Sequence, residues 1–374
     1  MAHWLAAILA VLAVSGGDAT TAGPKVESSE QCGRCHQVIF ETWSDSAHAS
    51  SLESPFLDVY LDMQEQGEAE ASRVCLSCHA PIIDLNGDGN LELRITWEGI
   101  NCEVCHSLVA VDLTGKGPKK VLEPGAVKRG PIRDAVETPA HQVAYSELHT
   151  QSLACAWCHE YVNPEGTPIL TTYSEWQEST AAERGETCQE CHMGRTETQA
   201  ADPRTEREAV ARVNLHQVPG GHSLEQLHRA FAVGISPFRD GGDVVIEIQL
   251  RNKGAGHAVP TGMPGRRVIL DVEVKTADGQ QFEAHEVYGK FFQDASGKRI
   301  TRDSGYFARG VKLDSDTRIG PDETRTEVLR FPVSPRATAY INVRMTYEHA
   351  PTGGEEGRTR ITFLSEKRTL VGKP

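Results

Sequence analysis

Hydrophobic and polar residues alternate with a period of two in the C-terminal part of the chain. The alternation runs through residues 244–250, 268–274, 326–331 and 339–347. Successive side chains of a β-strand point to opposite faces, so this pattern predicts strands that are buried on one side. Asp278 and Gly279 follow the second stretch and predict a tight turn. Short strands at this spacing favour an antiparallel, β-sandwich-like domain, which we expect over residues 236–374.

The N-terminus has a different pattern. Residues 4–14 are uniformly apolar, and small residues follow up to residue 22. This arrangement predicts a signal peptide over residues 1–22. The apolar stretch is shorter than the roughly 20 residues that a membrane-spanning helix needs, and no longer one follows. We therefore expect an exported chain, in the periplasm or outside the cell at its surface, with no transmembrane segment after processing.

Residues 23–235 carry one local motif five times, Cys-x-x-Cys-His. The motifs use all ten cysteines of the chain. Their members are Cys32, Cys35 and His36; Cys75, Cys78 and His79; Cys102, Cys105 and His106; Cys155, Cys158 and His159; and Cys188, Cys191 and His192.

This motif is the attachment site of c-type haem. Two thiols bond to the vinyl groups of a haem, and the following histidine becomes the first axial ligand of its iron. Structural zinc does not require a histidine after every second cysteine. Disulfides that stabilise a fold join distant segments, whereas these pairs are local. A thioredoxin-type redox motif normally occurs once. The sequence thus predicts five covalent haems c, with proximal ligands from the five motif histidines.

The predicted haem domain has too little protein per haem to build an ordinary apolar core. The motifs begin 27 to 53 residues apart. We expect short helices and loops wrapped around haems, which themselves form the core. The predicted fold is therefore α + β and multidomain, with a mainly helical and loop-rich pentahaem domain over 23–235 followed by the β domain.

The second axial ligand of each iron decides what that haem can do. A second histidine gives an electron-transfer haem, whereas an open position can bind substrate. Methionine is scarce, with five in the chain, so histidine is favoured. His257 lies where the β part begins and would tie the two domains together through iron. The distal candidates are His48, His141, His149, His216, His222 and His257.

Four stretches resemble the cytochrome c-554 family of multihaem carriers. They are CGRCH with the following Trp43-Ser-Asp-Ser-Ala-His48, the run Trp97–His106, the run His141–His159, and His216-Gln-Val-Pro-Gly-Gly-His222. The resemblance covers roughly residues 30–232. It implies that His48 and His222 are distal ligands, and more weakly His141, His149 and His216. The best-known members carry four haems, and the β part lies outside their pattern.

A loop between the second and third motifs has oxygen-bearing side chains at alternate positions around glycines. Such loops suit Ca²⁺, although Ile95 stands where an EF-hand would need its glutamate. A turn rich in Asp and Asn is the alternative. The candidate calcium ligands are Asp84, Asn86, Asp88, Asn90 and Glu92.

The charge of the chain limits its partners. Its 374 residues contain 52 Asp and Glu against 38 Lys and Arg, a net charge of −14. This excludes a typical nucleic-acid-binding protein and suits redox partners, a donor and an acceptor, that are basic or are other cytochromes. The pair Arg266-Arg267 is interpreted as solvated.

We expect an electron carrier rather than an enzyme. Two alternatives stay open. One is a multihaem oxidoreductase in which a five-coordinate haem acts on a small nitrogen or sulfur compound. The other is a self-associating subunit of an extracellular cytochrome filament.

Overall fold

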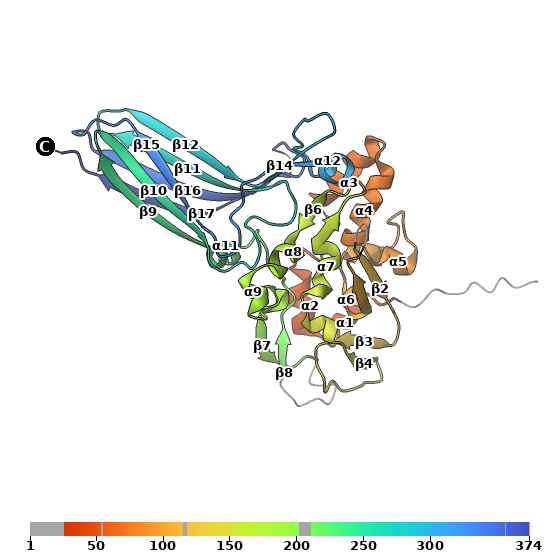
Figure 1. Cartoon of the computed structure of the whole chain (residues 1–374). Coiled ribbons are helices and arrows are strands. Elements are labelled where there is room, and N and C mark those ends of the chain that lie inside the picture. The colour runs from red at the N-terminus through yellow and green to blue at the C-terminus, as the bar shows by residue number, and fades with distance from the viewer. Residues whose placement is uncertain (1–25, 54, 115–117, 202–210, 356, 374) are drawn as a thin grey trace, which may run out of the picture.

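The computed structural model describes residues 26–53, 55–114, 118–201, 211–355 and 357–373. The predicted signal peptide lies outside them. A helical part and an elongated β part lie side by side, with α11 at one end of their junction and α12 at the other (Figure 1). Among the described residues, no helix combines the length and the apolar composition needed to cross a bilayer.

The N-terminal part consists of short helices and two-stranded sheets. Its helices are α1 Ser29–Gly33, α2 Gln37–Ser44, α3 Phe56–Glu65, α4 Ala69–His79, α5 Ile83–Asn86, α6 Cys102–His106, α7 Leu153–His159, α8 Thr172–Gln177, α9 Thr180–Glu183, α10 Cys188–His192 and α11 Leu224–Ala230. Two 3₁₀ turns are Arg94–Glu98 and Glu147–Thr150.

Four small sheets connect these helices where only loops were expected. Three of them are antiparallel, and β3 pairs with β4 in parallel. The strands are β1 Leu108–Asp112 with β2 Lys119–Leu122, β3 Val127–Gly130 with β4 Gln142–Tyr145, β5 Glu160–Val162 with β6 Pro168–Thr171, and β7 Arg195–Thr198 with β8 Ala211–Asn214.

The C-terminal part is a sandwich of two antiparallel sheets, in the orders β15-β10-β9 and β12-β11-β16-β17. Its strands are β9 Phe231–Asp240, β10 Asp243–Asn252, β11 Arg266–Thr276, β12 Gln281–Tyr288, β13 Lys290–Gln293, β14 Lys312–Asp316, β15 Thr324–Phe331, β16 Ala339–His349 and β17 Thr359–Leu370. The remaining helix is α12 Asp303–Arg309, and β13 pairs with β14 apart from both sheets.

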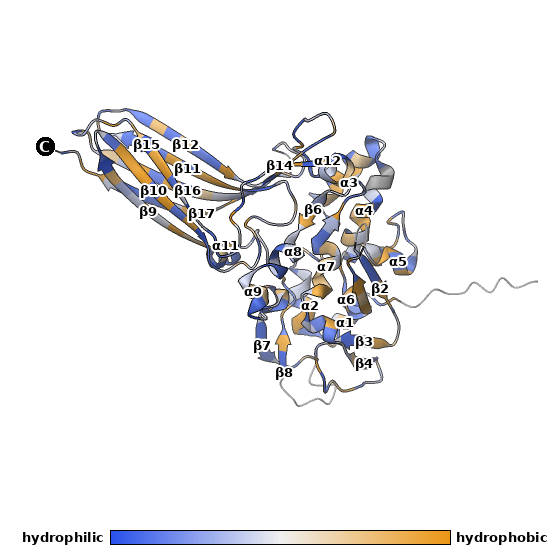
Figure 2. Ribbon diagram, viewed as in Figure 1, coloured by the Kyte–Doolittle hydropathy of each residue, from blue (hydrophilic) through white to orange (hydrophobic). Residues whose placement is uncertain are grey.

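The alternating sequence pattern explains the core of this sandwich. Val268, Leu270, Val272 and Val274 on β11 are buried and pack against apolar side chains of β10 from the facing sheet. Figure 2 shows the resulting bands of hydrophobic residues along the strands. The predicted helical-then-β order and the antiparallel sheets are thus confirmed. Strand β9 begins at Phe231 and runs across the predicted boundary at residues 235 and 236.

Candidate haem sites

Short helices hold the cysteines and histidines of the motifs. Positions i, i+3 and i+4 share one face of a helix, so a Cys-x-x-Cys-His sequence presents both thiols and the imidazole together. Helices α4, α6, α7 and α10 each end on the motif histidine. Local capping fixes two of them, because Asn101 accepts a hydrogen bond from the Val104 amide and Thr187 forms a capping box with Glu190.

The motif histidines are oriented for metal binding. The Nδ1 atoms of His36, His79, His106 and His192 lie 2.5 to 2.8 Å from backbone carbonyl oxygens of Ala200, Ser51, Arg129 and Pro219. An Nδ1–H that donates to a carbonyl fixes the ring and leaves Nε2 as the ligating atom. Burial also lowers the pKa of His106 and His159 to about 3, which favours the neutral, ligating imidazole.

Four motif histidines face a second histidine at nearly constant separation. Ring centroids are 6.0 Å apart for His36 and His141, 6.4 Å for His159 and His48, 6.3 Å for His106 and His216, and 6.3 Å for His192 and His257. A metal ion held about 2 Å from a nitrogen of each ring separates the centroids by roughly 6 Å. These residues therefore fit an iron between each pair.

Three of the four non-motif partners have the same orienting hydrogen bond. Nδ1 of His141, His216 and His257 lies 2.9 to 3.1 Å from the carbonyl oxygens of Gln142, Asn214 and Ala258. Burial lowers the pKa of His48 to about 4, so its ring is neutral as well. Each of the four residues thus meets the chemical requirements of a distal ligand.

His149 competes with His216 for the same position. Its ring centroid is 5.9 Å from that of His106. However, its Nε2 is 2.8 Å from the carbonyl oxygen of Cys105, within the motif that supplies the proximal ligand, and its buried Nδ1 has no hydrogen-bond partner in the described structure. Among the described residues, no carbonyl engages Nε2 of His216 in that way, so His216 is the better distal candidate.

The His79 site differs from the other four. The ring of Phe56 stacks on His79 at 3.9 Å and 11°, and this is the ring contact that the structure gives His79. His222, the remaining distal candidate, instead lies 5.7 Å from Tyr347 and 6.5 Å from His349 between ring centroids. Among the described residues, the second motif is therefore the one whose histidine faces no second imidazole.

The five motifs contact one another in an order that differs from their order in the chain. Cys32 lies within hydrogen-bonding reach of Cys102, and Cys155 of Cys188. Cys158 Sγ lies 4.0 Å from the Cys78 carbonyl oxygen. The first motif thus adjoins the third, and the fourth adjoins both the second and the fifth. Cys105 also acts electrostatically on Cys155, which links the third motif to the fourth.

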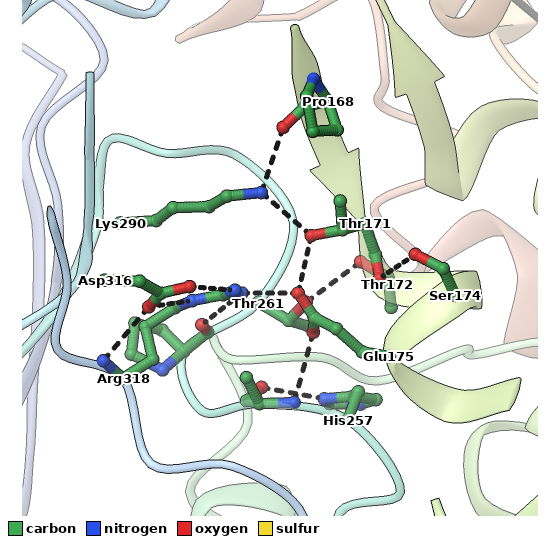
Figure 3. A network of polar contacts seen from close by, with 12 residues as sticks. Pro168, Thr171, Thr172, Ser174, Glu175, His257, Thr261, Lys290, Asp316 and Arg318 are labelled. Carbon is green, nitrogen blue, oxygen red and sulfur yellow. Dashed lines mark hydrogen bonds and ion pairs between the residues drawn. The ribbon is translucent and has the colours of Figure 1, made fainter. Parts of the chain in front are cut away.

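A buried polar network holds His257 at the junction of the two parts. Glu175 on α8 accepts hydrogen bonds from Arg318 (2.7 Å), the Thr261 hydroxyl (2.8 Å) and the Ala258 amide (3.1 Å), and these groups surround the His257 loop (Figure 3). Lys290 donates to the Pro168 carbonyl at 3.0 Å. The sequence offered no signal for this network, because its charged residues resemble surface residues.

Two of the candidate calcium ligands, Asp84 and Asp88, are engaged with protein groups. Both carboxylate oxygens of Asp88 accept hydrogen bonds, from the Glu92 and Leu93 amides and the Thr96 hydroxyl, and Asp84 pairs with Lys120 at 2.8 Å. Among the described residues, no group of three or more His, Cys, Asp or Glu side chains is arranged to hold a metal ion. These contacts favour the turn interpretation, and calcium binding stays a prediction.

Known proteins resemble both the motif region and the whole chain. Residues 31–107, which span the first three motifs, match the family described as cytochrome c554 and c-prime. Cytochrome c-554 of Nitrosomonas europaea is 24% identical over 170 residues, which cover 42% of this chain and 67% of that protein. The crystal structure of a penta-heme cytochrome c552 from Thermochromatium tepidum aligns with a TM-score of 0.72 at 22% identity, covering 92% of this chain and 99% of that one. The first three motifs thus lie in a region that matches the cytochrome c554 and c-prime family, and the fold of the whole chain, including the β-sandwich, is similar to that of the penta-heme protein.

Proposed function

We propose that the protein is an exported pentahaem c-type cytochrome that carries electrons between a donor and an acceptor protein. The haems would be held by the five Cys-x-x-Cys-His motifs and would supply irons that alternate between two oxidation states. His48, His141, His216 and His257 would be the distal ligands. The observation that carries this proposal is the 6.0–6.4 Å separation of four histidine pairs.

The contacts between motifs support conduction along the protein. Cysteines of the first and third motifs lie next to each other, and the fourth motif lies next to the second and the fifth. The third and fourth motifs are close enough for Cys105 to influence Cys155 electrostatically. A path through the fourth motif would therefore branch toward the second and the fifth. Two imidazoles on an iron keep small ligands away from it and favour electron transfer over substrate binding. The net charge of −14 suits a partner with a basic docking surface.

The site of the second motif favours a second function, that of an oxidoreductase. His79 has the orienting bond of a proximal ligand, to Ser51, but stacks on Phe56 instead of facing a second histidine. We infer that the iron of this haem keeps an open position, and that the other haems exchange electrons with it.

Haem counting and spin counting test both functions. A pyridine haemochrome assay of the exported protein should give five haems per chain, and Cys75→Ala should give four. The carrier function predicts low-spin irons, and the open position predicts one high-spin ferric iron. A count of five in the Cys75→Ala variant would refute the assignment of the second motif.

A further inference from the structure

Arg266 at the start of β11 is an arginine of the β part whose charge lacks a counter-ion. It is half-buried, and among the described residues no carboxylate forms an ion pair with it. Its Nε atom is buried and has no hydrogen-bond partner there, while Nη1 donates to the Thr261 carbonyl at 3.2 Å. Arg266 was interpreted from the sequence as solvated, and its burial corrects that interpretation.

A buried donor without a partner is unusual. Leaving such a group unpaired costs about 1–3 kcal/mol, and more when the group is charged. Buried polar groups are normally paired, so the Nε atom of Arg266 points to an acceptor that does not belong to the described protein groups.

The loop before β11 fixes the position of the guanidinium group. Gly262 has a φ of +81°, and a Cβ atom there would lie 2.8 Å from Nη1 of Arg266. The Arg266 amide donates to the Met263 carbonyl at 3.0 Å and closes the turn. A glycine at position 262 therefore permits both the left-handed turn and the close approach of the side chain.

The same loop is bound to the helix that lies beside the fourth motif. The Thr261 hydroxyl lies 2.8 Å from the Glu175 carboxylate and 3.0 Å from the Thr172 hydroxyl, both on α8 (Figure 3). Helix α8 packs against α7, which carries the fourth motif. The Ser174 amide on α8 also donates to Glu160, the residue after the motif histidine, at 3.0 Å. These contacts hold Arg266 next to the fourth motif.

The charge of Arg266 acts on the histidine of that motif. Burial is the main cause of the lowered pKa of His159, and four neighbouring groups follow. Three of them, His48, His192 and His257, are proposed ligands of iron and are neutral in that role. Arg266 is the fourth, and its charge is permanent.

The second motif feels the same arginine, but there its charge is offset. Burial again dominates the lowered pKa of His79, Arg266 lowers it further, and the carboxylate of Asp303 opposes Arg266. The groups that act most strongly on His159 include no carboxylate. The net influence of Arg266 should therefore be larger at the fourth motif than at the second.

We propose that Arg266 binds a propionate group of the haem at the fourth motif and raises the reduction potential of that haem. A haem carries two propionate carboxylates, and the planar guanidinium group is suited to carboxylates. Nε would be the donor that completes this contact. Reduction adds an electron to the site, so a nearby positive charge favours it.

This inference rests on the haem attachment proposed above and deepens it. The proposed electron path branches at the fourth motif. A residue of the β-sandwich would therefore set the potential at the branch point.

Three variants of the five-haem holoprotein test the role of Arg266 by spectroelectrochemical titration. Arg266→Gln removes the charge, and Arg266→Lys keeps the charge but not the fork of N–H groups. Arg344→Gln is the matched control, because it changes the net charge equally at a side chain of β16 that is 51% exposed and 3.8 Å from Asp271. A His48→Met variant identifies the haem, since methionine in place of histidine raises the potential of the iron that it binds.

Arg266→Gln should make the reduction of one haem about three- to tenfold less favourable. This lowers its potential by about 30–60 mV, because a tenfold change in a one-electron equilibrium is about 59 mV. The displaced haem should be the one whose potential His48→Met raises. Arg266→Lys should recover at least half of the shift, and Arg344→Gln should change every potential by less than twofold in the equilibrium constant.

Resonance Raman spectra report on the propionate itself. The propionate bending band should move in Arg266→Gln and stay in place in Arg344→Gln. An Arg266→Gln variant with five haems and wild-type potentials, or with a displaced potential but an unmoved propionate band, would overturn the inference. A shift at a haem other than the one that His48→Met raises, or no response to His48→Met, would overturn the assignment to the fourth motif. Fewer than five haems in the wild type would instead overturn the proposed function.

Discussion

The imidazole rings of His192 and His257 lie 6.3 Å apart and only 17° from parallel, although one belongs to the fifth motif and the other to the loop that enters β11. With His257 as the proposed distal ligand, the β-sandwich would complete a haem site of the N-terminal part. Glu175 and Arg318, which hold the His257 loop, would then maintain a ligand of iron as well as a junction between the two parts.

Replacing His257 by alanine should convert one low-spin iron to high spin while all five haems remain attached. The covalent thioether bonds and His192 would still hold the haem, but its second ligand would be lost. Electron paramagnetic resonance of the ferric protein measures this change. His285→Ala is the control, since His285 is exposed and pairs with Asp271 on the surface of the sandwich. An unchanged spectrum for His257→Ala would remove His257 from the ligand set.

The competition between His216 and His149 can be decided by two single variants. His216→Ala should create one additional high-spin iron, because its ring lies 6.3 Å from that of His106, at the separation expected for two ligands of one iron. His149→Ala should leave the spin count unchanged, because Nε2 of His149 is bonded to the Cys105 carbonyl. The reverse result would assign His149 as the ligand, through its unpartnered Nδ1.

Glu175→Gln should destabilise the junction by about 3 kcal/mol. The variant leaves Arg318 beside a neutral group, and the arginine side chain is only 8% exposed. Removing one partner of a buried ion pair leaves an uncompensated charge, although Asp316 retains part of the pairing here. Denaturant unfolding monitored by tryptophan fluorescence measures the change. Glu355→Gln, at a side chain that is 75% exposed, should cost less than about 1 kcal/mol.

Because Lys290 is buried, we expect the free energy of unfolding to increase with pH. Burial, with a smaller contribution from the charge of Arg318, lowers the pKa of Lys290 to about 8, and Glu175, Asp316 and Glu160 oppose this shift. Between pH 8 and the ordinary pKa of about 10.4, the unfolded chain binds a proton that the folded protein lacks, so stability increases with pH.

The Lys290→Met variant isolates this effect from other titrating groups. The stability of the wild type relative to the variant should be constant below about pH 7. It should then increase by up to about 3 kcal/mol as the pH approaches 10. A difference that stays flat, or that falls with increasing pH, would contradict a depressed lysine pKa.

Local patterns account for the parts of this molecule that the sequence predicts well. The period-two alternation at 268–274 became the buried face of β11, and each Cys-x-x-Cys-His lies on or beside a short helix because its spacing is itself helical. His257 could be proposed as a link between the two parts because it follows a glycine-rich turn at the start of the β part.

Contacts between segments that are distant in the chain could not be predicted from local sequence patterns. His222 resembled a family ligand, yet its ring lies beside Tyr347 and His349. Phe56 carries no local mark of a role near His79, because its ring contact with His79 depends on the packing of α3 against α4. The number of histidines in the sequence therefore predicts how many axial ligands are available. Only the fold shows which histidine lies opposite which motif histidine.

Spin quantitation of the fully oxidised protein tests the central claim most directly. With five haems per chain established chemically, the account predicts four low-spin irons, one for each histidine pair, and one high-spin iron at the His79 site. Five low-spin irons would contradict the open position. Two or more high-spin irons would contradict the pairing of His36, His106, His159 and His192 with their distal histidines.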